Sequence, residues 1–336
     1  MRLLVTGGAG FIGHNFCLYW LEKYPKDSIV NLDNLTYAGL PSNVNEAKAA
    51  FGSRYIFVTG DICNFELVNR TVRSYRPDLI VHFAAETHVD RSISGPLAFT
   101  LTNVVGTHYL LEAARQNNIR FHHVSTDEVY GFLPLGIGKF TENTPYNPTS
   151  PYAASKAAAD HLVRAYFKTF GLPITISNCS NNYGPYQFPE KLIPLAITNL
   201  LQDRKVPVYG DGLYVRDWLY VLDHCRAIDL IIQSGRIGET YLIGGQTQDL
   251  PNIQIIKQIL RIMGKSEDEI EWVKDRPAHD RRYAVDWSKI HRQLGWSPHF
   301  DFEDWLRMTI NWYSEHEEWW KALKGQSLDQ RDWHKT

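Results

Sequence analysis

Tyr152 and Lys156 stand four residues apart, a spacing that makes two side chains neighbours on one face of a helix. A nearby ammonium favours the phenolate and lowers the pKa of the phenol, so Tyr152 could act as a general base. Pro151 is typical of a helix start, which would also bring the positive end of the helix dipole to the phenol. In a chain with 18 tyrosines this spacing also arises by chance, so its interpretation depends on its surroundings.

A hydroxyl and two carboxylates follow one another at Thr126, Asp127 and Glu128. Thr126 could hydrogen-bond the same substrate oxygen from which Tyr152 takes a proton. Two close carboxylates split their titrations, so one can stay protonated as an acid while the other serves as a base. Adjacent side chains on a regular strand point to opposite faces, so both can reach one substrate only if the chain turns here. The alternative is that the two acids are solvated residues that cap the next segment.

A glycine-rich turn, Gly7–Gly13, lies between a short apolar run and an amphipathic segment. Gly8, Gly10 and Gly13 fit the spacing G-x-G-x-x-G, and Gly7, Gly10 and Gly13 fit G-x-x-G-x-x-G. In such a turn one glycine permits the tight bend, one lets the backbone approach a pyrophosphate, and one packs helix against strand. The following helix offers free N–H groups and the positive end of its dipole to the phosphates. The turn therefore predicts a dinucleotide site.

Acidic or small residues follow three further apolar runs, where a dinucleotide would lie. Asp33, twenty residues beyond Gly13, could accept hydrogen bonds from the ribose hydroxyls of an adenosine. The same carboxylate would repel the additional phosphate of NADP, so the sequence favours NAD. Asp61 could flank the adenine or be an ordinary turn residue. Ala84 and Ala85 are small enough for their backbone to meet the cofactor.

The elements that must position these residues alternate along the first half of the chain. Short runs rich in Val, Ile, Phe or Leu are separated by amphipathic segments such as Phe11–Tyr24 and Val104–Asn117. This alternation predicts an α/β fold, a Rossmann-type doubly wound parallel sheet covered on both faces. Substrate and cofactor sites in such sheets lie at the carboxyl ends of the strands. The predicted strands are Arg2–Thr6, Ser28–Leu32, Tyr55–Thr59, Leu79–Phe83, Arg120–Ser125 and Ile174–Asn178.

After Asn178 the pattern loosens because prolines interrupt it. Trp305, Trp312 and Trp319 recur every seven residues, which predicts one packing seam along the last helix. We expect residues 1–178, with 217–245 rejoining them, to form an NAD-binding Rossmann domain. Residues 179–216 and 246–336 would form a smaller, discontinuous α/β domain that binds the substrate. The elements predicted in this half are a strand-helix unit at Asp217–Gln233, a strand at Glu239–Ile243, and helices at Asn252–Met263 and Phe302–Trp320.

Length and charge exclude several classes of protein. The 336 residues suit two lobes or one large α/β domain. The net charge of −2 argues against binding to a nucleic acid polymer, because such binding needs a surplus of cations. Neither a signal peptide nor an apolar run of roughly 18 residues is present, so we expect a cytoplasmic protein without a membrane span. No Cys or His spacing predicts a metal site, and the four scattered cysteines are expected to be buried free thiols.

Taken together, the glycine turn, the Tyr-x-x-x-Lys pair and the Thr126 hydroxyl resemble the extended short-chain dehydrogenases/reductases. The triplet Thr126-Asp127-Glu128 resembles the nucleotide-sugar 4,6-dehydratase branch of that family, and most closely its members that act on dTDP-glucose. The resemblance covers nearly the whole chain. Further matching stretches are Ala84–Ile93, Ser180–Pro194, Arg216–Val221 and Asp275–Tyr283.

The resemblance implies an internal redox cycle that uses NAD. Tyr152 would take the proton of the glucose 4-hydroxyl while the C4 hydride passes to NAD, and the resulting ketone would acidify the C5 proton. Glu128 would remove that proton, and Asp127 would protonate the departing 6-hydroxyl. The hydride would return to C6, giving dTDP-4-keto-6-deoxyglucose. Lys156 would tune Tyr152 and hold the nicotinamide ribose, and Thr126 would bind the 4-oxygen.

The resemblance also implies an assembly and two sets of ligand contacts. Family members commonly dimerise through two helices per subunit, here roughly Pro96–Asn117 and Tyr152–Phe170, so we expect a homodimer. The residues expected around NAD are Gly7, Gly10, Phe11, Ile12, Gly13, Asp33, Asn34, Thr36, Asp61, Ile62, Phe83, Ala84, Ala85, Thr102, Tyr152, Lys156 and Asn182. Those expected around the nucleotide-sugar are Thr87, Thr126, Asn181, Lys191, Leu192, Pro207, Tyr209, Arg216, Asn252, Arg276 and His279.

Two departures from the family pattern adjoin the nucleotide pocket, the sequence of Gly244–Asn252 and Ala278 in place of the usual glycine. They keep UDP-glucose open as an alternative substrate to dTDP-glucose. A nucleotide-sugar 4-epimerase shares the tyrosine, the lysine and NAD but needs no carboxylate pair, so Asp127 and Glu128 argue against it. A non-catalytic NAD-sensing protein could lose the tyrosine or the lysine, and both are present here.

Overall fold

The computed structural model describes residues 1–245, 249–275, 280–299 and 301–324. Its centre is a seven-stranded parallel sheet with the strand order β10-β6-β5-β4-β1-β2-β3. This confirms the predicted α/β Rossmann-type doubly wound sheet, and each strand predicted in the first half ends within about one residue of its predicted bounds. The strands are β1 (Arg2–Thr6), β2 (Ser28–Asp33), β3 (Tyr55–Thr59), β4 (Leu79–His82), β5 (Arg120–Thr126), β6 (Ile174–Cys179) and β10 (Thr240–Ile243).

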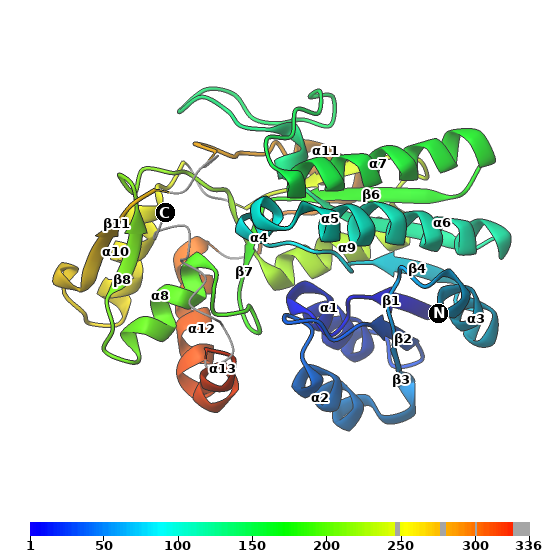
Figure 1. Cartoon of the computed structure of the whole chain (residues 1–336), viewed down its shortest axis with the longest axis horizontal. Helices are drawn as coiled ribbons and strands as arrows, with labels where there is room; N and C mark the ends of the chain where they lie inside the picture. Colours follow the sequence, from blue (N-terminus) through cyan, green and yellow to red (C-terminus); the bar gives the residue numbers. More distant parts are fainter. Residues whose placement is uncertain (246–248, 276–279, 300, 325–336) are drawn as a thin grey trace.

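Helices cover both faces of the sheet because successive strand residues point to opposite sides (Figure 1). On one face Leu4 and Val30 pack with residues of α3, α6 and α7. On the other face Leu3 and Ile29 pack with residues of α1, α2 and α9. Burial on both faces explains why the strands read as continuous apolar runs. These helices are α1 (Phe11–Lys23), α2 (Pro41–Phe51), α3 (Phe65–Tyr75), α6 (Thr107–Gln116), α7 (Pro151–Phe170) and α9 (Val221–Ser234).

The chain between β4 and α6 is helical but irregular. It contains α4 (Val89–Ser94), α5 (Pro96–Phe99) and a π-helical segment, Thr100–Gly106, so the predicted helix Val104–Asn117 begins as a π-helix. Asn103 in the π-helical segment is buried and donates to Glu86 O at 3.0 Å and to Ser155 Oγ at 2.8 Å. This segment therefore connects the chain after β4 to helix α7.

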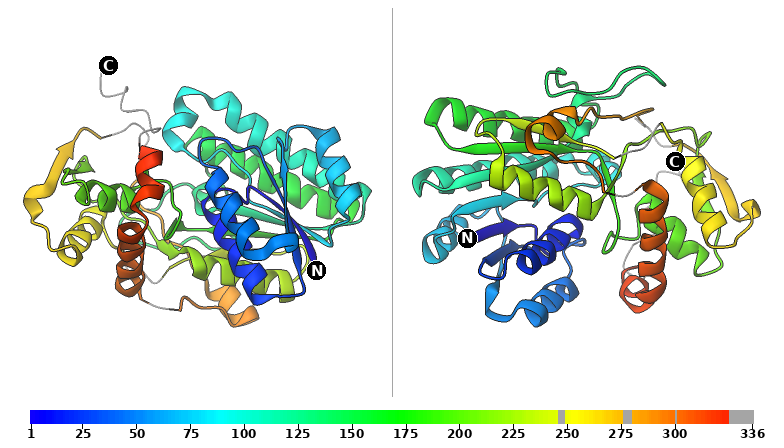
Figure 2. Two further views of the ribbon diagram at one scale, coloured as in Figure 1. Left: turned by 90° about the horizontal axis from the view of Figure 1, so that it is seen from below. Right: turned by 180° about the vertical axis from the view of Figure 1, so that it is seen from behind.

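A second group of elements packs around its own apolar core beside the sheet (Figure 2). Strands β8 and β11 pair in parallel, and helices α8, α10, α12 and α13 contribute to the same core. Strand β10 joins the main sheet beside β6, whereas β9 pairs with β7 in a separate two-stranded sheet. The elements are β7 (Asn181–Tyr183), α8 (Leu192–Leu200), β8 (Val206–Tyr209), β9 (Trp218–Tyr220), α10 (Asn252–Ile262), β11 (Ile270–Val273), α11 (Ser288–Leu294), α12 (Phe302–Glu315) and α13 (Glu317–Lys324).

The prediction of one helix over Phe302–Trp320 is wrong, because the chain breaks at His316 into α12 and α13. His316 has φ −117° and ψ 42°, outside the helical region. All three tryptophans nevertheless pack in the same apolar core, as the seven-residue period predicted, although their nearest partners differ. Trp305 stacks on Tyr220 at 3.7 Å, Trp312 stacks on His316 at 4.4 Å, and Trp319 donates to Asn43 of helix α2.

Two kinds of feature are absent from the described ranges. No helix among these residues has both the length and the apolar character needed to cross a bilayer. Within the same part of the chain, no group of three or more His, Cys, Asp or Glu side chains is arranged to hold a metal ion.

Candidate active site

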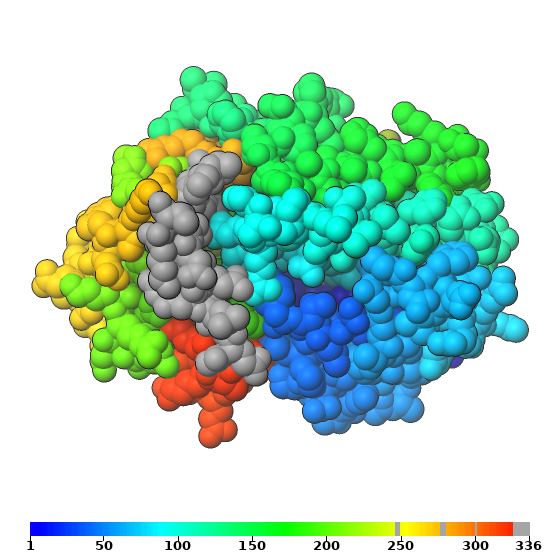
Figure 3. Space-filling model, in the orientation of Figure 1, coloured from blue at the N-terminus to red at the C-terminus, as the bar shows by residue number. Residues whose placement is uncertain are grey.

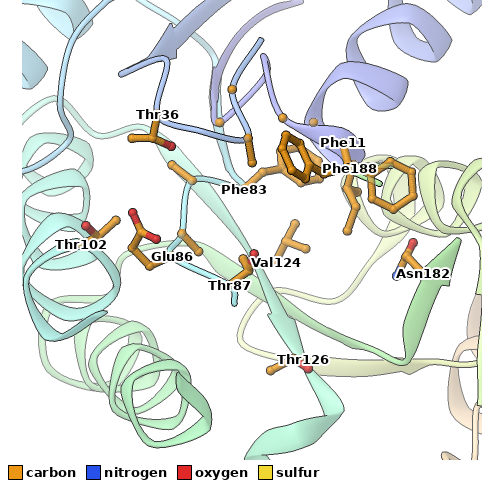
Figure 4. A pocket seen from close by; sticks show the side chains of 18 of the residues that line it. Phe11, Thr36, Phe83, Glu86, Thr87, Thr102, Val124, Thr126, Asn182 and Phe188 are labelled. Atoms are coloured by element: carbon orange, nitrogen blue, oxygen red, sulfur yellow. The ribbon is translucent and has the colours of Figure 1, made fainter. Parts of the chain in front are cut away.

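A cavity of about 330 Å³ lies at the carboxyl ends of the strands, where Asp33, Phe83, Thr126 and Cys179 all reach its wall. Figure 4 shows Thr102 on one side of this cavity and Asn182 on the other. Every residue predicted to contact the cofactor lines it. These residues are Gly7, Gly10, Phe11, Ile12, Gly13, Asp33, Asn34, Thr36, Asp61, Ile62, Phe83, Ala84, Ala85, Thr102, Tyr152, Lys156 and Asn182.

The three glycines of the turn are required for different physical reasons. Gly7 has φ +76°, and a Cβ there would lie 2.6 Å from the Ala84 nitrogen. A Cβ on Gly13 would lie 2.2 Å from Gly7 O, so only glycine lets helix α1 pack this closely. A Cβ on Gly10 would meet no protein atom closer than 3.4 Å. The space beside Gly10 is therefore left open by the protein, as a pyrophosphate against the backbone would require.

Asp33 supports the glycine turn as well as facing the cavity. Its Oδ2 accepts from Ala9 N at 2.9 Å and its Oδ1 accepts from Leu35 N at 2.8 Å. Burial raises the pKa of Asp33, although these two backbone hydrogen bonds lower it. A carboxylate oxygen can accept more than one hydrogen bond, so Asp33 retains capacity for a ribose hydroxyl. Nearby, Asn34 Nδ2 donates to Asp61 Oδ2 at 3.2 Å.

Helix α7 begins where the sequence predicted and carries Tyr152 in its first turn. Pro151 is its first residue, and Ser150 Oγ accepts from Ala153 N at 3.1 Å as an N-cap. Lys156, which is buried, donates from Nζ to Val124 O at 2.9 Å. Burial lowers the pKa of Lys156 to about 8. The hydrogen bond to the strand and the helical spacing fix the lysine beside the cavity.

The pKa of Tyr152 is raised and not lowered, contrary to the expectation from the sequence. Burial raises the pKa of Tyr152 well above its usual value, and the charge of Glu128 raises it further, although a hydrogen bond with Thr126 lowers it. The spacing of Tyr152 and Lys156 reveals one neighbouring cation. It could not include the desolvation of the phenol, which here outweighs the favourable effects.

Thr126, Asp127 and Glu128 lie where β5 ends and a 3-10 turn, Asp127–Tyr130, begins. Thr126 Oγ1 accepts from Glu128 N at 3.3 Å, so the threonine caps the turn. The turn required by the two adjacent carboxylates is therefore present, and all three residues line the cavity. Asp127 is only 1% exposed. Burial, then the charges of Glu128 and Asp217, raise the pKa of Asp127 well above its ordinary value.

The structure brings only part of the predicted substrate set to the cavity. Thr87, Thr126, Asn181 and Lys191 line it. Arg216 lies instead over the Tyr283 ring at 4.4 Å, although its charge lowers the pKa of Asp127. Arg276, Ala278 and His279 lie outside the described residues. Four other predicted residues do not line the cavity, namely Leu192, Pro207, Tyr209 and Asn252, although Leu192 directly follows the lining residue Lys191.

Sequence reasoning missed two acidic residues of the cavity, Glu86 and Glu190. Burial raises the pKa of both carboxyl groups. Glu190 Oε2 lies 3.5 Å from His88 Nε2, and Tyr37 OH donates to Glu190 Oε1 at 3.5 Å. Both acids belong to stretches that carry the family resemblance, Ala84–Ile93 and Ser180–Pro194, and this was the available signal for them.

Known proteins match this chain over almost its whole length. The family model described as GDP-mannose 4,6 dehydratase matches residues 4–309. A dTDP-glucose 4,6-dehydratase of Xanthomonas campestris pv. campestris is 52% identical, with 94% of each chain covered. A protein of the same name from Salmonella typhimurium is 47% identical, with 96% of each chain covered.

Solved structures of similar proteins also cover almost the whole chain. The dTDP-glucose 4,6-dehydratase of Bacillus anthracis in complex with NAD is 48% identical and superposes with a TM-score of 0.90, covering 96% of this chain and 99% of that one. A UDP-glucose 4-epimerase of Thermotoga maritima is 28% identical with a TM-score of 0.87, covering 94% and 99%. The chain belongs to the GDP-mannose 4,6-dehydratase family of extended short-chain dehydrogenases/reductases.

Proposed function

We propose that this protein converts dTDP-glucose to dTDP-4-keto-6-deoxyglucose with loss of water, a hydro-lyase reaction that uses NAD. The observation that carries the proposal is the pair Asp127 and Glu128, which lines the same cavity as Tyr152 and Lys156. The raised pKa of Asp127 supports a carboxyl group that holds a proton at neutral pH. Relatives about half identical to this chain bear the name of the same reaction.

The residues present fit NAD. The open space at Gly10, the Asp33 carboxylate and the small residue Ala84 suit a dinucleotide laid across the strand ends. Asp33 would bind the adenosine ribose, and Lys156 would hold the nicotinamide ribose. When bound, NAD supplies a hydride acceptor for C4 of the sugar and a hydride donor for C6.

The chain's own groups then perform the proton transfers. Tyr152 takes the proton of the 4-hydroxyl, with Thr126 bonded to the same oxygen. The 4-ketone acidifies C5, and Glu128 removes the C5 proton. Asp127 gives its proton to the 6-hydroxyl, which leaves as water while the C5–C6 double bond forms. A buried, protonated carboxyl is suited to this donation because it delivers a proton that the solvent does not supply.

One alternative substrate and one alternative reaction require different features of the site. UDP-glucose would use the same chemistry, and the two sugar nucleotides differ at the base and at one ribose hydroxyl. A 4-epimerase would share the fold, as the TM-score of 0.87 to such an enzyme illustrates. Epimerisation requires no elimination, so Asp127 and Glu128 would have no role in that reaction.

We also propose how the chain divides into domains and how its copies assemble. We propose an NAD-binding domain of residues 1–178 with 217–245, and a substrate-binding domain of 179–216 with 246–336. We further propose a cytoplasmic homodimer that pairs through Pro96–Asn117 and Tyr152–Phe170. Exposed apolar side chains on this surface support the pairing, since Leu97 and Leu101 are 68% and 46% exposed. Figure 3 shows this region as one continuous outer face.

Mass spectrometry of the product tests the function directly. Purified protein is incubated with dTDP-glucose and, in parallel, with UDP-glucose, without added NAD or NADH. We expect loss of one water mass from dTDP-glucose at the higher rate, and deuterium at C5 when the reaction runs in heavy water. An unlabelled product, or a C4 epimer that keeps its 6-hydroxyl, would refute the proposal. Faster conversion of UDP-glucose would refute the assigned nucleotide alone.

A further inference from the structure

Behind the cavity, helix α7 carries a buried carboxylate that the proposed chemistry does not use. Asp160 is 0% exposed and follows Lys156 by four residues, so the two are neighbours on the helix. Its Oδ2 accepts from Tyr146 OH at 2.7 Å and from Asn178 Nδ2 at 3.0 Å. Its Oδ1 lies 3.3 Å from His123 Nε2. Burying a carboxylate costs several kcal/mol unless its surroundings compensate it, so its presence calls for a reason.

The partners of Asp160 lead to two parts of the active site. Asn178 Nδ2 also donates to Thr126 O at 3.1 Å, at the end of β5. His123 precedes Val124, whose carbonyl accepts from Lys156 Nζ at 2.9 Å. Asp160 is thus connected through Asn178 to the strand end that carries Thr126. Through His123 it is connected to the backbone that binds Lys156.

The charges around Asp160 show what it contributes. Although burial raises it, hydrogen bonds and the adjacent imidazole lower the pKa of Asp160 to about 2, so it is ionised. Burial lowers the pKa of His123 to about 4, so the imidazole is neutral at pH 7. Asp160 is therefore an anion, and its charge favours the cationic forms of both Lys156 and Arg164. The other titratable groups that face this region are His82 on β4, Tyr130 and Tyr146 before α7, and Cys179 on β6.

We infer that Asp160 is a positioning residue of the proposed reaction, which keeps Lys156 charged and, through Asn178, holds the Thr126 carbonyl in place. Burial alone removes the charge of an ammonium at lower pH, and an adjacent buried anion opposes this effect. Consistent with that role, the charge of Asp160 raises the pKa of Lys156. The inference rests on the proposed function only for the catalytic readout.

The first test measures the ionisation of Lys156 without any substrate. NMR of the purified protein labelled with ¹³C-lysine follows the titration, with Lys156→Arg to assign the resonance. We expect a midpoint near pH 8 in the unaltered protein and a midpoint at least about one unit lower in Asp160→Asn. Asp160→Ser removes the same charge with a smaller side chain and is used if the asparagine variant does not fold. An unchanged midpoint in a folded variant overturns the inference.

A matched control separates this effect from loss of a buried carboxylate in general. Asp229 is 1% exposed and accepts from Tyr19 OH and Tyr24 OH, both at 2.8 Å, but lies away from the cavity. Asp229→Asn should lower thermal stability without moving the Lys156 midpoint. A shift of similar size in both variants would mean a purely structural role and would also overturn the inference.

The second test reads the consequence for catalysis. Single-turnover oxidation of dTDP-glucose is followed against pH. Loss of the lysine charge disfavours the Tyr152 phenolate, so the alkaline fall in rate should begin at lower pH in Asp160→Asn. Asn178→Ala keeps the anion but loses the link to Thr126, so it should lower the rate roughly 10-fold without moving the profile. A profile unchanged in Asp160→Asn contradicts the inference, whereas an inactive parent protein refutes the proposed function and leaves the NMR test decisive.

Discussion

At the scale of single residues, the site distinguishes two neighbouring carboxyl groups by their surroundings. Asp127 is buried at the end of β5, whereas Glu128 is partly exposed. Burial and the charges of Glu128 and Asp217 favour the protonated form of Asp127. A site that places a protonated acid beside an accessible carboxylate can donate one proton and remove another, which an elimination requires.

Asp127→Asn should slow water loss far more than sugar oxidation, because an amide cannot donate the proton. We expect elimination to fall on the order of 10²- to 10⁴-fold, with absorbance of reduced cofactor accumulating in a stopped-flow trace. In the parent protein elimination should also fall as pH rises through the raised pKa of Asp127, since only the protonated form donates. Glu128→Gln is the control and should abolish deuterium entry at C5. If Asp127→Asn slowed sugar oxidation and water loss equally, Asp127 would not be the acid.

Substitutions in the glycine turn can distinguish an effect on NAD binding from an effect on folding. Gly10→Ala adds a methyl group that meets no protein atom closer than 3.4 Å, so the protein should fold with little loss of stability. Its NAD content after purification should nevertheless fall, because the methyl group occupies the space left for the pyrophosphate. Gly13→Ala places a Cβ 2.2 Å from Gly7 O and should lower the melting temperature first. A Gly10→Ala protein that retains its full NAD content would contradict this account.

The residues predicted to contact the cofactor line one cavity because most of them follow strand ends, which apolar patterning locates. Only some of the residues predicted to contact the substrate line the same cavity. Pro207 and Asn252 were carried over from the family resemblance, and they belong to β8 and α10 and do not line it. The direction of the Tyr152 pKa was also wrong, because desolvation depends on packing between distant segments that no spacing reports.

At the scale of elements, the first turn of α7 determines where the phenol lies. Tyr152 is the second residue of the helix, and Ser150 Oγ bonds the free N–H of Ala153. A cap of this kind stabilises a helix start by about 1 kcal/mol. The same bond also fixes the direction in which the chain enters the helix, and hence the position of the tyrosine.

Ser150→Ala should therefore lower both stability and turnover. Asn64, which caps α3 by accepting from Leu67 N at 3.0 Å, supplies a matched control that does not line the cavity. We expect both Ser150→Ala and Asn64→Ala to lose about 1 kcal/mol in chemical denaturation. Only Ser150→Ala should reduce kcat. Equal kcat in the two variants would show that the cap of α7 matters for stability alone.

Element boundaries were predictable where one local signal dominated. Pro151 and the serine before it determine the start of α7 on their own. The break at His316 was not predictable, because the tryptophan period continues through it. After the break, Trp319 bonds Asn43 of α2, and Trp320 Nε1 donates back to Tyr313 O of α12.

At the scale of the whole molecule, the second lobe contacts the first close to the glycine turn. Tyr186 OH donates to Glu46 Oε1 at 2.6 Å, which ties the chain before α8 to helix α2. Asn43, which accepts from Trp319 of α13, donates to Ala9 O inside the turn at 3.0 Å. The packing of the second group of elements and the conformation of the glycine turn are thereby connected through α2.

The proposed homodimer is tested most directly at Leu97, which is 68% exposed on the short helix α5. In a twofold interface each substitution acts twice, so Leu97→Lys would bury an unpaired charge from both copies. We expect the dimer dissociation constant to rise roughly 100-fold, equivalent to about 3 kcal/mol, measured by analytical ultracentrifugation. Met308→Lys, at a 51% exposed position on α12, is the control and should leave the assembly unchanged.

Because α5, the π-helical segment and α7 pack together, separation of the subunits should also loosen the helix that carries Tyr152. A monomeric parent protein, or a dimer unaffected by Leu97→Lys, would place the interface elsewhere or remove it.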